Sequence, residues 1–426
     1  MKDFIDVQER PSFGALLPLS FQHVFAMFGS TVLVPFLLKV DPATALFMNG
    51  IGTLLYLFVC QGKIPSYLGS SFAFIAPVLS VMAAGMSYEA AQGGFIAFGA
   101  AFIILSIIVR FVGIKWIDVI LPPAAMGAIV AVIGLELAPV AMGMAGITGD
   151  QWQSLGMTHM QVVTLSMFSL VVTILGTVLF RGFFAVIPVL IGVVAGYVLA
   201  TFMGVIDFGA VAAAPWFSFP HFYAPEYNLN AILMIMPALF VVFAEHVGHL
   251  VVTSNIVGRD LMQDPGLKRS LLGDGIANML SGFFGATPNT TYGENIGVLA
   301  ITRVFSVYVI GGAAVLAILF SFIGKIAALI HAIPVPVMGG VSILLFGIIA
   351  ASGLRMLVER KVDYTSPANL ILTSVVLITG VSGAKVAIGP VVLQGMGLAT
   401  VVAILISLAF TIFRKTGLGN KQLNRK

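Results

Sequence analysis

Residues 238–252 read ALFVVFAEHVGHLVV, an apolar run interrupted by one carboxyl and two imidazoles. An α-helix needs about 20 mostly apolar residues to cross a bilayer, and apolar sequence continues on both sides of this stretch. Glu245 therefore stands near the middle of a predicted membrane helix, where an ionised group costs about 2.5–3.5 kcal/mol. Its carboxyl is expected to take up a proton readily, and an ionisable group at such a depth is functional by default.

The composition of the whole chain agrees with a membrane protein. Of its 426 residues 59% are hydrophobic and 9% charged, and the mean hydropathy is +1.08, whereas an ordinary soluble domain carries about 25% charged residues. A soluble fold is excluded. The first apolar run begins near Ala15 after an N-terminus of mixed charge, so it is expected to be a span and not a signal peptide. Cys60 is the only cysteine, so no disulfide within the chain is expected.

The same length criterion predicts fourteen membrane spans. They lie near residues 14–38, 44–60, 67–84, 92–111, 119–141, 161–180, 183–205, 229–256, 270–286, 288–302, 304–324, 334–353, 367–383 and 396–413. The third and tenth are too polar and too rich in glycine for a plain lipid-facing helix. We expect these two segments to be discontinuous.

Lysine and arginine are distributed unequally between the two sides of this arrangement. Eighteen of the 21 bases fall on the side that holds both termini, and only Lys39, Lys325 and Lys385 fall on the other. Cytoplasmic loops carry the excess of these residues. The sequence therefore predicts a multi-pass protein of the cytoplasmic (inner) membrane with both termini in the cytoplasm.

The two halves of the chain echo one another in order. Gln22-His23-Val24 matches Glu245-His246-Val247, Ser70-Ser71-Phe72-Ala73 matches Thr290-Thr291-Tyr292-Gly293, and Pro122 with Met126-Gly127 matches Pro334 with Met338-Gly339. Seven spans in each copy, 14–205 and 229–413, would make the second copy enter the bilayer from the opposite side. Transporters with such inverted repeats bind solute near the bilayer midplane, where discontinuous segments meet. Spans three and ten are the discontinuous segments that we expect to meet at such a site.

Glu245 and His249 lie four residues apart and so share one face of the predicted helix. A carboxyl and an imidazole placed in this way are suited to a proton relay. A static polar pair that joins two helices is the alternative. For His246, one residue off that face, structural and functional interpretations stay equally open.

Span ten contributes a second group of polar residues. Gly293 permits unusual backbone angles beside Glu294, and Tyr292 offers a flat ring that Phe72 matches in the first copy. Two rings, free backbone N–H groups and carboxyls that accept N–H donors suit a small planar molecule with alternating amide groups, such as a nucleobase. Ordinary packing is the alternative for both rings.

The remaining polar residues define no further chemistry. Glu136 and Asp274 are interpreted as hydrogen-bonded structural acids, whereas His23 is expected to face the candidate site. The sequence has no phosphate-binding glycine loop, no nucleophile elbow and no metal-ligand spacing. We therefore expect no enzyme activity, no ATP-driven pumping, no cofactor and no metal. The bases are dispersed, which gives no support to nucleic-acid binding.

At these residues the chain resembles the nucleobase/ascorbate transporter family, most closely its bacterial members that carry uracil. The family signature reads Glu294-Asn295-Ile296-Gly297 followed by Thr302. Further matching motifs cover nearly the whole chain: Gln22-His23, Leu68-Gly69-Ser70-Ser71-Phe72-Ala73-Phe74, Pro122-Pro123-Ala124-Ala125-Met126-Gly127, Glu245-His246-Val247-Gly248-His249 and Ser382-Gly383-Ala384-Lys385.

The resemblance implies an all-α polytopic membrane protein with short paired strands in spans three and ten. Spans one to four and eight to eleven, about 14–111 and 229–324, would form a core domain. Spans five to seven and twelve to fourteen, about 119–205 and 334–413, would form a gate domain. A homodimer in the lipid bilayer is left open.

The resemblance also implies residue roles. Glu245 and Glu294 would hold the base, and His249 would couple to it through water. Phe72 and Gly293 would supply backbone donors, while Tyr292 would line the pocket. The supporting positions are Gln22, His23, Ser71 and Asn295.

The implied activity is inward symport of uracil with protons. A purine or xanthine carrier of the same family is the nearest alternative, although such members typically have glutamine at the position of Glu294. An anion exchanger of the same architecture is more distant, because a carboxylate at Glu294 would repel its substrate. A receptor or channel that transports nothing is the alternative from a different class.

Overall fold

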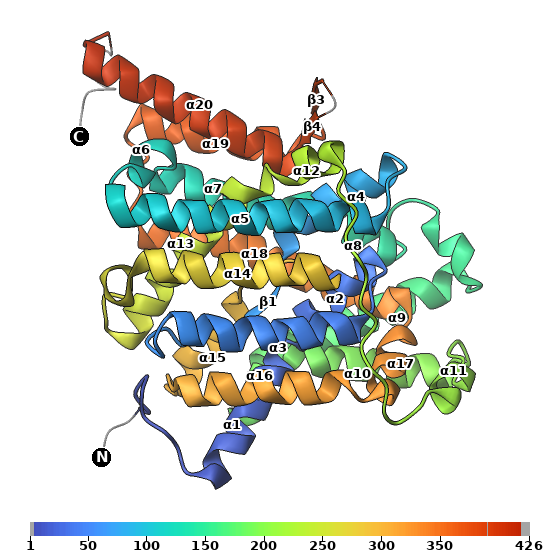
Figure 1. The fold of residues 1–426 in the computed structure, drawn as a ribbon. Helices are drawn as coiled ribbons and strands as arrows, with labels where there is room; N and C mark the ends of the chain where they lie inside the picture. Colours follow the sequence, from blue (N-terminus) through green and yellow to red (C-terminus); the bar gives the residue numbers. More distant parts are fainter. Residues whose placement is uncertain (1–3, 390, 419–426) are drawn as a thin grey trace.

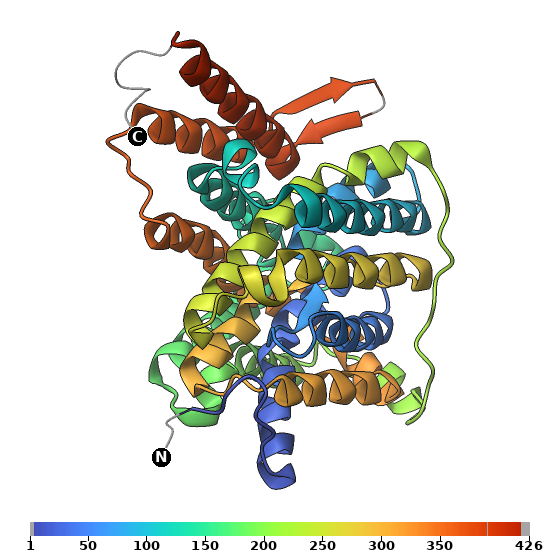
Figure 2. The same cartoon turned by 60° about the vertical axis from the view of Figure 1, so that its left-hand side comes forward.

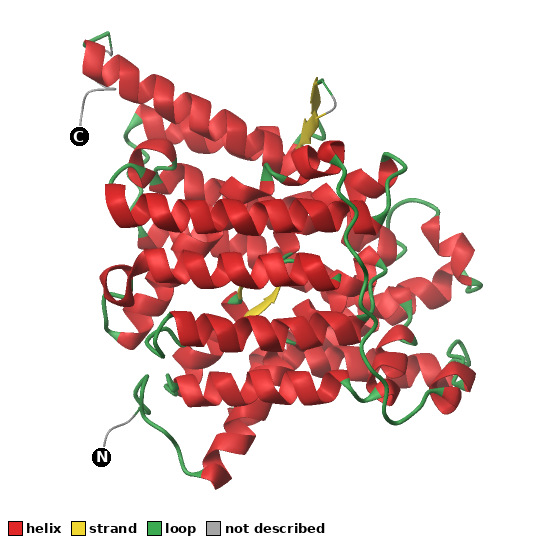
Figure 3. Ribbon diagram, in the orientation of Figure 1, coloured by secondary structure: helices red, strands yellow, loops and turns green. Residues whose placement is uncertain are grey.

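A computed structural model describes residues 4–389 and 391–418 of the chain. Helices account for most of these residues, as Figure 3 shows, and the strands among them are three or four residues long. This is the secondary structure that a bilayer favours, because every backbone polar group of a helix finds its partner within the same segment.

Eight helical segments of the described residues are long and apolar enough to cross a membrane. They are α1 with α2 (Phe13–Ala26 and Phe28–Leu38), α3 (Pro42–Val59), α5 (Tyr88–Val112), α7 with α8 (Pro123–Glu136 and Ala138–Met144), α9 (His159–Leu179), α12 with α13 (Leu229–Ile235 and Ala238–Val257), α18 (Val335–Glu359) and α20 (Gly395–Thr416). The chain is therefore a multi-pass membrane protein.

Further helices complete the described bundle. They are α4 (Ile75–Ala83) with the 3-10 turn η1 (Phe72–Phe74) before it, α10 (Pro188–Phe202), α14 (Leu267–Phe284), α15 (Gly293–Thr302), α16 (Val307–Ser321) and α19 (Pro367–Val381). Connecting pieces are α6 (Ile117–Ile120), α11 (Gly209–Ala213), α17 (Gly324–His331), η2 (Gln151–Leu155), η3 (Gly182–Val186) and η4 (Met262–Gly266). Each of the fourteen ranges that the sequence predicts contains at least one helix.

Several of the long segments are broken near one end. Pro139 stands in the first turn of α8, directly after α7, and Pro237 separates α12 from α13. A proline lacks the N–H that a continuous helix would use and its ring clashes with the preceding turn. The break before α13 lies eight residues ahead of Glu245, so this carboxyl sits well inside a regular helix.

The helices fall into two groups by their packing. In the first group α5, α14, α3 and α16 lie side by side in that order, as Figure 1 shows, and α1 packs against α16. In the second group α18 packs against α7, α8 and α9, α10 packs against α9, and α19 packs against α7 and α20. Helix α13 contacts α5 and α14 of the first group and α7 and α20 of the second, and it also contacts α15.

The distribution of side chains is that of a protein surrounded by hydrocarbon. Phe58, Phe111 and Phe202 are each more than three-quarters exposed on the outer surface. Polar side chains such as Asn49 and Gln92 are instead fully buried between helices. Lipid offers polar groups no hydrogen bonds, so they gather inside while apolar side chains face the bilayer.

A β-hairpin joins α19 to α20. Strand β3 (Lys385–Ile388) pairs antiparallel with β4 (Val391–Gln394), and every residue of β3 is exposed. Figure 2 shows the hairpin projecting away from the helices beside the start of α20. The sequence predicted no regular structure for this connection.

Candidate functional site

Two short strands meet between the helices and organise the candidate site. Strand β1 (Leu68–Ser70) pairs antiparallel with β2 (Asn289–Thr291), and all six residues are buried. The pairing is extended at one end by Ser71 N, which donates to Pro288 O at 2.8 Å, and at the other by Tyr292 N, which donates to Tyr67 O at 3.0 Å. Phe72 and Gly293 follow these strands and begin η1 and α15.

The Tyr292 ring packs onto the strands. A Cβ atom on Gly69 would stand 2.2 Å from two ring atoms, so only glycine leaves room for the ring there. The Tyr292 hydroxyl donates to Ser70 O at 3.1 Å, and the side chain is 2% exposed. Phe72 packs elsewhere, edge-on against Phe346 of α18 at 5.8 Å between ring centroids. The structure thus gives both rings packing partners.

A cavity of about 120 Å³ opens beside α13 and α15. Glu245, His249 and Gly293 all line it, so the structure brings these three predicted site residues together. Its other lining residues are Val130, Gly248, Val252, Ile256, Ile296, Gly297, Ala300, Ser352, Arg355, Met356 and Glu359. Glu294, Tyr292 and Phe72 are not in this lining. The cavity runs from the middle of α13 towards the C-terminal ends of α13, α15 and α18.

Glu245 and His249 present different hydrogen-bonding capacity to this cavity. His249 Nδ1 lies 3.0 Å from Thr291 Oγ1, and a Cβ atom on Gly293 would stand 3.4 Å from His249 Nε2. The imidazole is therefore wedged between the end of β2 and the start of α15. Glu245 Oε2 is buried without a hydrogen-bond partner among the described residues. An unpaired buried acceptor facing a cavity is suited to a ligand that brings an N–H donor.

Glu294 is held from a different helix. Ser30 of α2 is buried, and its hydroxyl donates to Glu294 Oε1. Glu294 lies in the first turn of α15, so this bond ties α15 to α2. The contact joins residues 264 positions apart. Sequence reasoning missed Ser30, for which the only signal was its place in the small, polar run Gly29-Ser30-Thr31 within an apolar stretch.

The structure pairs two of the four supporting residues, His23 and Asn295, with each other. Asn295 Nδ2 lies 3.0 Å from His23 Nδ1 and both side chains are almost fully buried, so α15 is also tied to α1. Gln22 is buried beside His23 on α1. Ser71 is fully buried, and its hydroxyl has no partner in the described part of the chain.

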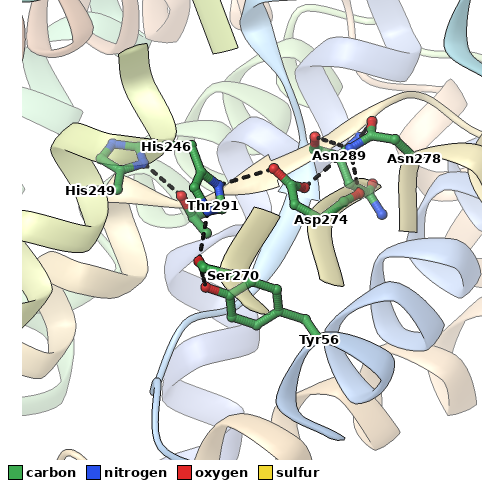
Figure 4. Close-up of polar contacts among 8 residues, drawn as sticks. All are labelled: Tyr56, His246, His249, Ser270, Asp274, Asn278, Asn289 and Thr291. Carbon is green, nitrogen blue, oxygen red and sulfur yellow. Dashed lines mark hydrogen bonds and ion pairs between the residues drawn. The ribbon is translucent and has the colours of Figure 1, made fainter. Parts of the chain in front are cut away.

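Two further acids have structural partners, as the sequence favoured. His246 Nδ1 lies 3.0 Å from Asp274 Oδ2, and both side chains are fully buried. Figure 4 draws this contact. Glu136 Oε2 accepts from Met396 N at 2.9 Å and so caps the start of α20. The partner of Asp274 is thus the histidine for which the sequence left both interpretations open.

The rim of the cavity carries a pair of opposite charges at the end of α18. Arg355 Nε lies 2.7 Å from Glu359 Oε1, one turn apart at the end of α18. Both residues line the cavity, with side chains 70% and 31% exposed. Such a pair in contact with water contributes at most about 1 kcal/mol.

The residues that the structure describes contain no cluster of three or more His, Cys, Asp or Glu placed to hold a metal ion. The side chains of Glu245, His249 and Glu294 can take part in hydrogen bonds. A cavity between apolar helices that is lined by protonatable side chains is typical of membrane transport proteins.

These features are those of a membrane transport protein. The sequence model of the Permease family (Xan_ur_permease) matches residues 14–389, and the chain belongs to this family. It is 58% identical to the "Uracil permease" of Paenibacillus larvae subsp. larvae, over 99% of this chain and 100% of that protein. It is 60% identical to the "Uracil permease" of Escherichia coli K12, over 96% of this chain and 94% of that protein. The family resemblance seen in the sequence is confirmed.

Solved structures with a similar fold are much more distant in sequence. SLC26A9 superposes with a TM-score of 0.66 at 12% identity, covering 94% of this chain and 65% of that one. The transmembrane domain of the cyanobacterial bicarbonate transporter BicA superposes with a TM-score of 0.58 at 14% identity, covering 95% of this chain and 99% of that domain. These likenesses concern the fold alone.

Proposed function

We propose that this chain carries uracil inward across the cytoplasmic membrane together with protons, by alternating access. The observation that carries the proposal is identity of 58–60% to two proteins named uracil permease over nearly their whole length. The cavity supports it, because Glu245 offers a buried, unpaired acceptor to a base that has N–H donors.

The proposal includes fourteen spans in two inverted repeats, with a core domain and a gate domain as the resemblance implies. Its support is the packing of the helices. The row of α5, α14, α3 and α16, with α1, belongs to the proposed core, and the group around α7, α9, α18, α19 and α20 belongs to the proposed gate. The β1–β2 pair joins the two repeats at equivalent places.

In the proposed site Glu245 and Glu294 accept the N–H donors of uracil, and the backbone N–H groups of Phe72 and Gly293 donate to its carbonyl oxygens. Glu245 also takes the coupled proton, with His249 assisting through water. Tyr292 contributes by shaping the strand pair on which Gly293 depends, since its ring packs against Gly69.

The conformation follows from the proposed orientation. With both termini in the cytoplasm, the C-terminal ends of α13, α15 and α18 point inward, and the cavity opens to the cytoplasm. Near the opposite end, Gln394 Nε2 of β4 donates to Ser80 Oγ of α4 at 2.5 Å, across the seam between the proposed domains. This contact closes the outer side in an inward-open state.

Uptake of labelled uracil into proteoliposomes tests the function. Uptake should require an inward proton gradient and should resist competition by xanthine and adenine. Absence of uracil uptake, or uptake indifferent to the gradient, would refute the proposal. Bicarbonate belongs among the competitors, because BicA shares the fold, and inhibition by it would favour an anion exchanger instead.

A further inference from the structure

Strand β2 is supported on only one side by another strand. It pairs with β1 over three residues, and an isolated two-stranded ribbon is marginally stable at best. At the edge away from β1, the side chain of Asn278 from α14 takes the place of a third strand. Asn278 Nδ2 donates to Asn289 O at 3.0 Å, and Asn289 N donates to Asn278 Oδ1 at 2.8 Å.

The orientation of the Asn278 amide is fixed by a chain of buried contacts, drawn in Figure 4. Asn278 Nδ2 lies 3.1 Å from Asp274 Oδ1, and Asp274 Oδ2 lies 3.0 Å from His246 Nδ1. His246 Nε2 lies 2.7 Å from Ser270 Oγ, which is 2.6 Å from the hydroxyl of Tyr56. All of these side chains are fully buried. A flipped amide would direct its oxygen at the Asp274 carboxyl and at Asn289 O.

The chain of contacts ties the parts of the proposed site to one another. His246 follows Glu245 on α13, so Asp274 anchors the helix that carries Glu245 and His249. Asn278 anchors β2, whose last residue Thr291 contacts His249 at 3.0 Å and which leads directly to Gly293. A shift of β2 would therefore remove the support of His249 and displace the start of α15.

We propose that Asn278 is a positioning residue for the substrate site. Its amide, oriented by Asp274 and His246, holds β2 in the place where Thr291 supports His249 and Gly293 can bind uracil. The inference rests on the proposed function. Asn278 does not line the cavity and acts only through the strand. Its loss leaves the Asn289 N–H and C=O unpaired in a water-poor interior, where such groups favour a rearranged backbone.

The first test is Asn278→Ala, with Ser281→Ala as its matched control. Ser281 is also buried on α14, one turn further on, and its hydroxyl has no partner among the described residues. We expect Asn278→Ala to raise the KM of uracil uptake about tenfold or more, a change of about 1.4 kcal/mol, with a smaller change in the maximal rate. Ser281→Ala should behave as wild type. Equal kinetics of the two variants would overturn the proposal.

Asn278→Asp tests the same inference in a variant that keeps the size of the side chain. A protonated carboxyl donates one hydrogen bond and accepts another, as the amide does, whereas an ionised one can only accept. The titratable groups in this chain of contacts are Asp274 on its own helix, His246 on α13 and Tyr56 on α3. The KM of this variant relative to wild type should be near one at acid pH and rise about tenfold at alkaline pH. A ratio that does not change with pH would contradict the positioning role.

Thr291→Val identifies the route of the effect. It removes the hydroxyl that contacts His249 and leaves the Asn278 amide in place. If Asn278 acts through Thr291, the double variant should raise KM no more than the larger single change, whereas full additivity would mean that the two act independently. The wild-type protein is included in every assay. Its failure to take up uracil would refute the proposed function, whereas normal uptake by wild type and by the variants would refute only the positioning role.

Discussion

Gly69→Ala should disrupt the candidate site from a position that touches no substrate. Its Cβ would stand 2.2 Å from Cε2 and Cζ of Tyr292 and 2.7 Å from the hydroxyl oxygen. Ordinary contact begins at 3.4 Å, so the ring must retreat by at least about 1.2 Å, the difference between 3.4 and 2.2 Å. Tyr292 is 2% exposed and has little free space to enter.

The expected size of the effect of Gly69→Ala follows from two free-energy costs. Overpacking a close-packed interior costs about 1–3 kcal/mol, and loss of the hydrogen bond from Tyr292 to Ser70 O costs about 0.5–1.5 kcal/mol more. Tyr292 is also the residue directly before α15, so its displacement moves Gly293 and Glu294. We expect a KM for uracil raised more than about tenfold, because 1.4 kcal/mol of lost binding already gives that factor.

The assay is uptake into proteoliposomes together with thermal unfolding of the purified protein. Gly347→Ala is the matched control, since Gly347 lies within α18 and a Cβ there would meet nothing within 4 Å. Alanine is favoured over glycine inside a helix by about 0.5–1 kcal/mol, so this variant should unfold no earlier than wild type. A folded Gly69→Ala protein with the KM of wild type would refute the reasoning.

Two more experiments test contacts between elements. Ser30→Ala removes the hydroxyl that donates to Glu294 and should weaken uracil binding about tenfold in an equilibrium binding assay, because hydrogen bonds to charged groups contribute about 1.5–3 kcal/mol. The Ser30→Thr variant keeps a hydroxyl and should bind uracil normally. Equal affinity of the two variants would show that this hydrogen bond does not support binding. A thiol cross-link between Ser80→Cys and Gln394→Cys should stop uptake until it is reduced, and because Cys60 is buried the single-cysteine variants serve as clean controls. Continued uptake by the cross-linked protein would contradict domain movement at this seam.

Much of the fold could be predicted from regular spacing. Apolar runs of helical length locate the helices because hydrocarbon tolerates little else. Four-residue spacing places Glu245 and His249 on one face, and the structure puts both in one cavity with Gly293. These relations are local in sequence, or are repeated at equivalent places in its two halves.

The remaining features of the site depend on contacts that produce no periodic pattern in the sequence. The bond from Ser30 to Glu294 joins distant helices, and the Asn278 amide binds backbone groups that any residue other than proline would offer at position 289. The place of the Tyr292 ring is set by the missing side chain of Gly69. A repeat can show that Phe72 and Tyr292 occupy matching positions, but packing decides which neighbours each ring has.

The antiparallel strands also have an electrical consequence. Because β1 and β2 run in opposite directions, the helical segments that follow them, Phe72–Ala83 and Gly293–Thr302, leave the interior in opposite directions with both N-terminal ends inside. Each such end carries roughly half a positive charge from its unpaired N–H groups. Both ends therefore direct partial positive charge at the region between them. That partial charge favours an ionised carboxyl at Glu294 and the carbonyl oxygens of a neutral solute, and it opposes a bare cation.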